Sequence, residues 1–160
     1  MLLLTFCVGA ERYAIDSGQV VEITPMVRIK RLPLAEAYVA GVINYRGHPS
    51  PVVDLCQLLE QRPCAARMSS RIILVRFEAA DGQSHVLGMI AEQVTEAIKR
   101  DQRDFEDPGI RVRNAPFLRA VCSDDRGMIQ LIDTGRLLPR DLAESLFDGN
   151  LVIEQASGAA

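Results

Sequence analysis

Short apolar runs separated by polar turn residues follow one another along most of this chain. Runs of about four to eight apolar and β-branched residues are typical of strands, and Gly, Asp and Asn between them favour hairpins. Asp81-Gly82 is the strongest hairpin signal, because this dipeptide suits a tight two-residue turn. The runs predicted as strands are residues 2–8, 12–16, 71–79, 84–91, 117–122 and 128–132.

Other segments are less regular. Residues 26–32 alternate apolar and basic side chains, the period of a half-buried strand, and residues 93–99 fit a strand or a helix by pattern alone. Residues 34–39 are expected to form one helical turn, and the charged residues 100–116 a long surface loop. A terminal helix is predicted over residues 139–147, because its first residue is a proline.

The stretch from Gly41 to Leu55 carries the densest signals. An apolar run leads into a turn with one cation, Arg46, at the bend. Pro49 and Pro51 predict that no regular central strand runs through this part, since proline lacks the backbone donor that a strand uses. Asp54, with a glutamine three residues later, predicts the N-cap of a short helix over residues 55–60.

Two pieces of sequence recur. Residues 52–59 and 131–138 share two aliphatic residues, an aspartate, three variable positions and Leu-Leu, at a spacing of 79 residues. Residues 19–22 recur at 93–96, a spacing of 74 residues. Two matches in the same order, at nearly half the chain length, indicate a duplicated β-unit. The alternative interpretation is that strand-to-helix junctions converge on an aspartate cap.

Composition narrows the function classes. The 160 residues predict one domain or two very small ones, and a net charge of −3 argues against a general affinity for nucleic acid or anionic membranes. Aromatic residues make up 5% and tryptophan is absent, so the core is aliphatic. The four cysteines form no C-x-x-C pair and match no zinc spacing, so we expect buried free thiols, with disulfides or metal ligands as the alternatives.

No catalytic group is predicted. His48 and His85 are the only histidines, and no nucleophile or phosphate-binding loop accompanies them. Asp54 and Asp133 are expected to cap helices. The first residues lack the basic region of a signal peptide, and no run approaches the ~20 apolar residues that span a bilayer. We therefore expect a cytoplasmic protein that is not an enzyme and that binds neither a metal nor a cofactor.

A set of motifs runs collinearly through the first half of the chain and returns more loosely in the second. They are Tyr13-Ala14-Ile15-Asp16, Val20-x-Glu22-Ile23, Leu32-Pro33, Gly41-Val42-Ile43-Asn44-x-Arg46-Gly47 and Pro51-Val52-Val53-Asp54-Leu55, then Gly88-x-Ile90, Val94-x-Glu96 and Leu131-Ile132-Asp133-x-x-x-Leu137-Leu138. In this order and spacing they resemble the CheW family of chemotaxis coupling adaptors, from Leu3 to about Phe147.

The resemblance implies a mainly β fold, with two pseudo-repeated, five-stranded SH3-like β-barrels, short helices and a C-terminal helix. The first barrel would lie largely within residues 1–65 and the second within 66–138. Residues 139–150 would pack back on them, and residues 151–160 would form a tail.

The resemblance also implies partners. An adaptor of this family links the cytoplasmic tip of a chemoreceptor to the regulatory domain of a CheA-like histidine kinase, and meets the membrane only through the receptor. Positions matching the receptor groove are Val20, Glu22, Arg46 and Gly47. Positions near the kinase surface are Val39, Gly41 and Val42.

We expect Glu22 and Arg46 to reach the surface and to pair, with Val21 and Ile23 pointing inward. His48-Pro49 departs from the two aliphatic residues that are usual in the family, and the loop of residues 101–116 is rich in charge. These departures leave the receptor, the kinase and the pathway open, and fit a non-flagellar signalling cluster at least as well as motility.

An alternative is a small β-barrel that binds single-stranded nucleic acid or a peptide. Basic residues in 28–31 and 99–113 would form a stripe on such a barrel. The acidic net charge and the few aromatic residues available for base stacking argue against nucleic acid.

Overall fold

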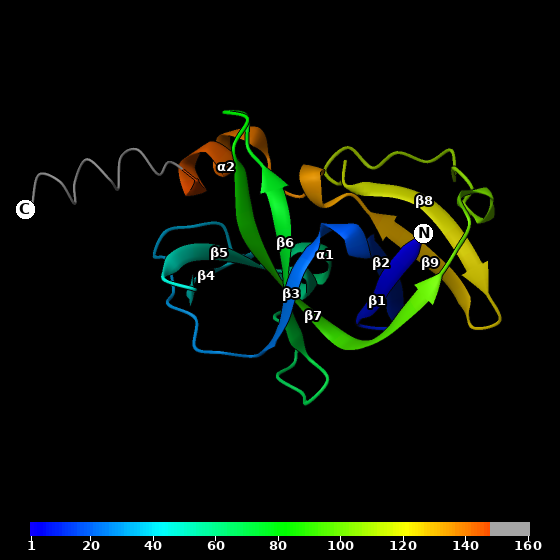
Figure 1. The fold of residues 1–160 in the computed structure, drawn as a ribbon, viewed down its shortest axis with the longest axis horizontal. Helices are drawn as coiled ribbons and strands as arrows, with labels where there is room; N and C mark the ends of the chain where they lie inside the picture. Colours follow the sequence, from blue (N-terminus) through cyan, green and yellow to red (C-terminus); the bar gives the residue numbers. More distant parts are fainter. Residues whose placement is uncertain (148–160) are drawn as a thin grey trace, which may run out of the picture.

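The computed structural model describes residues 1–147, which form a mainly β fold with nine strands and short helices (Figure 1). The strands are β1 Leu2–Val8, β2 Glu11–Asp16, β3 Val20–Pro25, β4 Val39–Tyr45, β5 His48–Asp54, β6 Arg71–Glu78, β7 Ser84–Lys99, β8 Leu118–Asp124 and β9 Gly127–Ile132. The helices are α1 Leu55–Glu60 and α2 Arg140–Leu146, with 3-10 turns η1 Ser17–Gln19, η2 Gln102–Asp104 and η3 Thr134–Arg136.

The strands fall into two five-stranded units that share β7. The first unit has the order β3-β6-β7-β5-β4, and the second has the order β7-β1-β2-β9-β8. Figure 1 shows β7 leaving the first unit and running on into the second. Within residues 1–147, strand pairing does not close either unit. An isolated bridge, Lys30–Val42, ties the loop after β3 to the edge strand β4 in the first unit, and Glu106–Val121 ties the loop after β7 to the edge strand β8 in the second.

The two units repeat the same pairing. In the first, β5 pairs in parallel with β7, the second strand of the β6–β7 hairpin, with Val52 opposite Gly88. In the second, β9 pairs in parallel with β2, the second strand of the β1–β2 hairpin, with Leu131 opposite Ala14. The second unit therefore takes its hairpin from the N-terminus, and the expected division of the chain near residue 65 does not coincide with the units.

Three hydrophobic clusters hold the fold together, and the largest lies between the units. It contains Phe6, Ile15, Leu55 and Met89, which are at most 1% exposed. Smaller clusters fill the first unit, around Val52 and Leu74, and the second unit, around Leu3 and Ile129. Apolar burial drives association roughly in proportion to buried area, so the two units are joined mainly by this shared cluster.

Most predicted elements are confirmed. The helix over residues 55–60 begins at Asp54, whose side chain accepts a hydrogen bond from the Gln57 amide at 3.1 Å. Residues 93–99 are strand, as the second half of β7. The terminal helix is α2, with Pro139 at its N-cap, while residues 148–160, including the predicted tail, lie outside the described residues. No helix within residues 1–147 has the length and apolarity needed to cross a membrane.

Two predictions about the segment between β3 and β4 are wrong. Residues 26–32 do not form a strand, and Lys30 alone makes an isolated bridge. Residues 34–39 form turns and then enter β4, without a helical turn.

The two prolines do lie in a strand. Pro49 and Pro51 pair with Asn44 and Val42 in regular antiparallel register. The Val42 amide and carbonyl bond to Lys30, on the opposite side of β4 from β5. The Val42–Pro51 pair is therefore a non-hydrogen-bonded one, and neither proline occupies a position that donates to β4.

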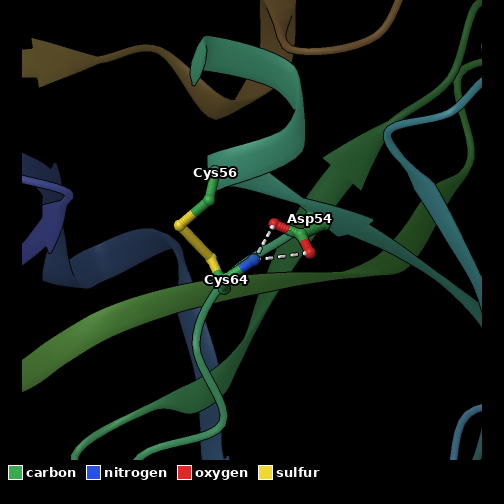
Figure 2. A group of neighbouring side chains, drawn as sticks. All are labelled: Asp54, Cys56 and Cys64. Carbon is green, nitrogen blue, oxygen red and sulfur yellow. Dashed lines mark hydrogen bonds between the residues drawn. A yellow bond between two sulfur atoms is a disulfide. The ribbon is translucent and has the colours of Figure 1, made fainter. Parts of the chain in front are cut away.

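The expectation of free thiols is wrong for two of the cysteines. Cys56 in α1 and Cys64 in the loop after it form a disulfide (Figure 2). Cys7, which is half-buried, and Cys122, which is buried, are free. The sequence gives little sign of the bond, because it depends on a chain reversal after α1 that brings Cys64 back beside Asp54.

Candidate partner-binding site

The β4–β5 hairpin holds Arg46 at its tip. Arg46 and Gly47 are the two loop residues, with φ values of 51° and 84°. Two residues at positive φ form the turn that matches the twist of a hairpin, and glycine adopts it without strain. The Asn44 side chain accepts the Gly47 amide at 2.8 Å and fixes the turn. Arg46 is held in a backbone conformation that arginine rarely adopts, and its side chain is 76% exposed.

Three side chains meet at this tip. The Arg46 Nη2 atom lies 3.9 Å from a carboxylate oxygen of Glu22 on β3, which confirms the expected pair. The Arg46 guanidinium also lies over the Tyr45 ring, 5.4 Å from its centroid. Hydrogen bonding to Glu22 raises the pKa of Tyr45 above its ordinary value. We call Glu22, Tyr45, Arg46 and Gly47 the Arg46 corner.

The charges of the Arg46 corner remain available to a partner. The Glu22 side chain is 41% exposed, and an exposed pair of this kind contributes only ~0–1 kcal/mol to folding. The carboxylate therefore orients the guanidinium without burying it.

The β3 strand beside this corner differs from the prediction. Val21 and Ile23 were expected to point inward, but they are 39% and 42% exposed, while Val20 and Glu22 are half-buried. β3 alternates between half-buried and exposed positions along its whole length, in the opposite phase to the prediction. Its register against β6 also shifts between Val20 and Glu22.

An apolar strip therefore runs along β3 and its continuation. Val21, Ile23, Met26 and Val27 are each between 37% and 46% exposed. We call these four residues the β3 strip. Ile23 alternates with Glu22 along β3, so its side chain lies on the opposite face of the strand from the Glu22 carboxylate.

The residues predicted near the kinase surface lie in β4 and are mostly covered. Val39 is 6% exposed and packs in the first unit. Gly41 is buried at a φ of 146°, and a Cβ atom there would collide with the Lys30 carbonyl oxygen. Val42 is half-buried and exchanges two backbone hydrogen bonds with Lys30. These positions shape the edge of the unit more than they offer side chains to a partner.

One group of potential metal ligands lies elsewhere. The Asp54 carboxylate and the sulfur atoms of Cys56 and Cys64 lie within 4.8 Å of one another (Figure 2). The two sulfurs are bonded to each other, and the carboxylate accepts the Gln57 and Cys64 amides. With the disulfide formed, this group is a structural one.

The family follows from comparison with known proteins. A family model described as the CheW-like domain matches residues 2–142. The chain belongs to the CheW-like family. The chemotaxis protein CheW of Bacillus subtilis is 24% identical over 145 residues, covering 89% of this chain and 90% of that protein. CheW of Treponema pallidum is 31% identical over 137 residues, covering 84% and 80%.

A solved structure extends the likeness to three dimensions. The scaffolding protein TtCheW of Thermoanaerobacter tengcongensis superposes with a TM-score of 0.75 at 28% identity, covering 86% of this chain and 87% of that one. The expected fold, mainly β with SH3-like units of the CheW type, is confirmed.

Sequence reasoning missed part of the site. It identified Glu22, Arg46 and Gly47, which the structure brings together, and Val20, which packs against the cluster between the units. It missed Tyr45 and the exposure of the β3 strip. Tyr45 was recognisable as the aromatic residue next to the turn cation, whereas the exposure of Val21 and Ile23 depends on which face of β3 the rest of the chain covers.

Proposed function

We propose that this CheW-like chain is a coupling adaptor that holds the cytoplasmic tip of a chemoreceptor at the Arg46 corner and binds the regulatory domain of a CheA-like histidine kinase elsewhere on the first unit. It works in the cytoplasm, without a cofactor and without catalytic activity of its own. It meets the membrane only through the receptor.

One observation carries the receptor side of this proposal. Arg46 projects from a turn that arginine rarely adopts, with its exposed guanidinium over the Tyr45 ring and near Glu22. Arginine and tyrosine are enriched among the residues that dominate the binding energy of protein interfaces. The carboxylate of Glu22, 3.9 Å away, holds the guanidinium only loosely, so Arg46 is free to bind the carboxylate of a partner.

The partner that fits the Arg46 corner is a helical tip with a carboxylate for Arg46. A guanidinium forms paired hydrogen bonds with a carboxylate, which fixes orientation as well as affinity. Val20 supports the strip from beneath, because it packs against the cluster between the units.

We place the kinase at the β4 edge of the first unit, near Val39, Gly41 and Val42. Lys30 bridges Val42 there and leaves the segment of residues 31–38 as the outer layer of that edge. Contact with the kinase would pass through this segment, supported by the buried β4 residues.

Reconstitution tests the proposal. The purified chain is mixed with a receptor cytoplasmic fragment and a CheA-like kinase, and kinase autophosphorylation is measured. The expected result is a rise in kinase output only when all three are present, and no ATP binding by the chain alone. An unchanged kinase rate, with both binding events verified, would contradict the adaptor role. Single-stranded DNA at low salt serves as the control ligand and should not bind.

A further inference from the structure

The Cys56–Cys64 disulfide lies at a junction of three elements. Cys56 is 0% exposed and belongs to the cluster between the units, whereas Cys64 is half-buried in the loop that follows α1. The bond joins the first turn of α1 to that loop across a separation of eight residues. The loop therefore has a covalent attachment to the core that joins the two units.

Polar contacts hold the two cysteines together independently of the bond. The Asp54 carboxylate accepts the Gln57 amide at 3.1 Å and the Cys64 amide at 3.0 Å. The Cα atoms of the cysteines are 5.0 Å apart, within the range that a disulfide requires. Asp54 thus fixes both ends of the reacting pair.

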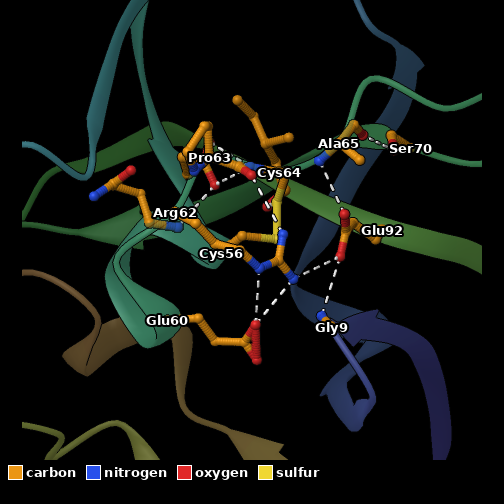
Figure 3. The surroundings of a disulfide bond; sticks show 12 residues. Gly9, Cys56, Glu60, Arg62, Pro63, Cys64, Ala65, Ser70 and Glu92 are labelled. Atoms are coloured by element: carbon orange, nitrogen blue, oxygen red, sulfur yellow. Dashed lines mark hydrogen bonds and ion pairs between the residues drawn. A yellow bond between two sulfur atoms is a disulfide. The ribbon is translucent and has the colours of Figure 1, made fainter.

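Glu92 anchors the rest of the loop (Figure 3). Its carboxylate accepts the Ala65 amide at 2.9 Å and the Gly9 amide at 3.0 Å, and lies 3.4 Å from the Arg62 guanidinium. Burial raises the pKa of Glu92, but these three contacts outweigh burial and lower it below its ordinary value. The segment of residues 61–70 is therefore held by charge and hydrogen bonds on both sides of the disulfide.

We propose that Cys56 and Cys64 are a reversible thiol–disulfide site, which exchanges with low-molecular-weight thiols and controls the order of residues 61–70. The proposal rests on the cytoplasmic setting proposed above, where a disulfide is ordinarily transient or redox-sensing. It also rests on the contacts of Asp54 and Glu92, which keep the fold intact and the cysteines adjacent when the bond is open.

The exchange is balanced in atoms and electrons. The thiolate of a small thiol attacks the sulfur of Cys64, the more accessible of the two, and the sulfur of Cys56 leaves as a thiolate and takes a proton. A second small thiol attacks the mixed disulfide, which releases Cys64 as a thiol. Two electrons pass from two small thiols to the protein, and the small thiols leave as their own disulfide. Oxidation of the protein by a small disulfide is the reverse sequence.

The position of Glu92 gives the exchange a structural consequence. Glu92 lies where β7 passes from the first unit to the second, at a register shift, and the next residue, Gln93, has a φ of 47°. Opening the disulfide removes the covalent restraint and leaves residues 61–70 held by Asp54 and Glu92. The loop then samples open states more often, at the seam between the units.

The first test is a redox titration of the full chain. The oxidised and the fully reduced protein are each equilibrated in buffers of varying reduced and oxidised glutathione, alkylated with a maleimide, and counted for thiols by intact mass. The expected result is a transition of two thiols per chain that converges from both directions, with Cys7 and Cys122 free throughout. A bond that survives excess dithiothreitol in the native protein, a protein that never oxidises, or one that stops at a glutathione adduct would overturn the proposal.

Two variants sharpen this test. Asp54→Asn should lower the oxidised-to-reduced ratio several-fold in the same buffer, because it weakens the contacts that align the cysteines. Asp133→Asn is the matched control, since Asp133 caps the equivalent turn of the second unit through the Gly135 amide. It should leave the ratio unchanged. Equal shifts from both variants would mean that Asp54 acts only through general stability.

The second test measures the loop. Hydrogen exchange of the peptide covering residues 61–70 should be at least tenfold faster in the reduced protein, while β6 exchanges equally in both states. Equal exchange of the loop would contradict its control by the disulfide. Both tests use the isolated chain, so their outcome does not depend on the receptor or the kinase. A failed reconstitution would contradict the proposed function and leave the redox result unchanged. A failed redox test would contradict the thiol–disulfide site and leave the adaptor function unchanged.

Discussion

The two units carry the same charged corner in different states. In the first, Arg46 follows β4 and faces Glu22 on β3; in the second, Arg126 follows β8 and faces Glu96 on β7. The glutamates are 74 residues apart, the same spacing as the sequence repeat. The corner is therefore part of the duplicated framework, and what differs is how firmly each arginine is held.

The second corner is closed. Arg126 lies 2.7 Å from Glu96, and its amide donates to Asp124 at 2.8 Å. The two terminal guanidinium nitrogens of Arg12 in turn donate to the Asp124 carboxylate, at 2.7 and 2.9 Å. The first corner is open, at 3.9 Å, and Arg46 is more exposed than Arg126, 76% against 57%.

The residues beside the two glutamates also differ between the units. The exposed positions beside Glu22 are Val21 and Ile23, whereas those beside Glu96 are Thr95 and Ala97. One copy of the corner has exposed aliphatic neighbours and a loosely held cation, and the other has small neighbours and a cation in an ion-pair network. The first corner therefore suits the receptor site proposed above, and the second suits a structural tie.

The largest effect that we expect is a loss of stability from a substitution in β4, the edge strand that leads to Arg46. Gly41 and Ala120 occupy equivalent positions, each within a register shift of its hairpin. Gly41→Ala would place a Cβ atom against the Lys30 carbonyl at a φ of 146°. We expect it to lower the free energy of unfolding by about 2–3 kcal/mol, measured by denaturant titration.

Ala120→Gly is the matched control for that change. It adds backbone freedom in a strand, for which we expect a loss of about 0.5–1 kcal/mol. If Gly41→Ala is no more destabilising than Ala120→Gly, the close approach of Lys30 to β4 is not a constraint on the fold.

The second-largest expected effect compares the two corners by reversing the charge of the arginine in each. Arg46→Glu should weaken receptor binding more than tenfold, because a hot-spot arginine contributes about 2 kcal/mol or more at an interface. The melting temperature should be nearly unchanged, since the pair with Glu22 is exposed. Titrations with receptor fragment and kinase domain, with a melting curve for each variant, measure both quantities.

Arg126→Glu makes the same charge change at the closed corner. It should lower the melting temperature, because it sets a carboxylate against Glu96 and Asp124, and it should leave receptor binding within about twofold. If Arg46→Glu unfolds the protein, Arg46 is structural. If it abolishes kinase binding and spares the receptor, the two surfaces have been assigned in reverse.

The sequence was sufficient for features set by neighbouring residues. The Asp81-Gly82 hairpin, the Asp54 cap and the repeat depend on short-range turn and capping chemistry, and each is present. The position of Arg46 followed from its turn. These are the cases in which local preference and tertiary structure agree.

The rest depends on contacts between distant segments. The bulge between Val20 and Glu22 arises from the pairing of β3 with β6, about fifty residues later in the chain. Pro51 fits β5 because Lys30 takes the hydrogen bonds of Val42 on the other side of β4. The Cys56–Cys64 bond requires the loop to return to Asp54. None of these has a signature in the hydrophobic pattern, since each is decided by which partner a backbone group meets.

The smallest effect is a dependence of stability on pH that comes from the closed corner. Hydrogen bonding by the Arg12 guanidinium, opposed by partial burial and aided by the Arg126 amide, lowers the pKa of Asp124 well below its ordinary value. The unfolded chain therefore binds a proton at this carboxyl near a pH of about 4, where the folded protein does not. The stabilisation is fully present above that pH and is lost as the pH falls toward the lower folded pKa.

Asp124→Asn makes this contribution measurable. At neutral pH the variant should melt below the unmodified chain, and the difference should shrink as the pH is lowered through about 4 toward 3. Asp125→Asn is the control, because it removes the same charge from the same turn without removing the carboxylate that Arg12 binds, which is that of Asp124. The difference in melting temperature between Asp125→Asn and the unmodified chain should change less over that pH range. A gap for Asp124→Asn that stays constant from neutral pH to pH about 3 would show that the carboxylate charge does not hold the second corner closed, and the contrast between the two units would then rest on the residues beside the glutamates alone.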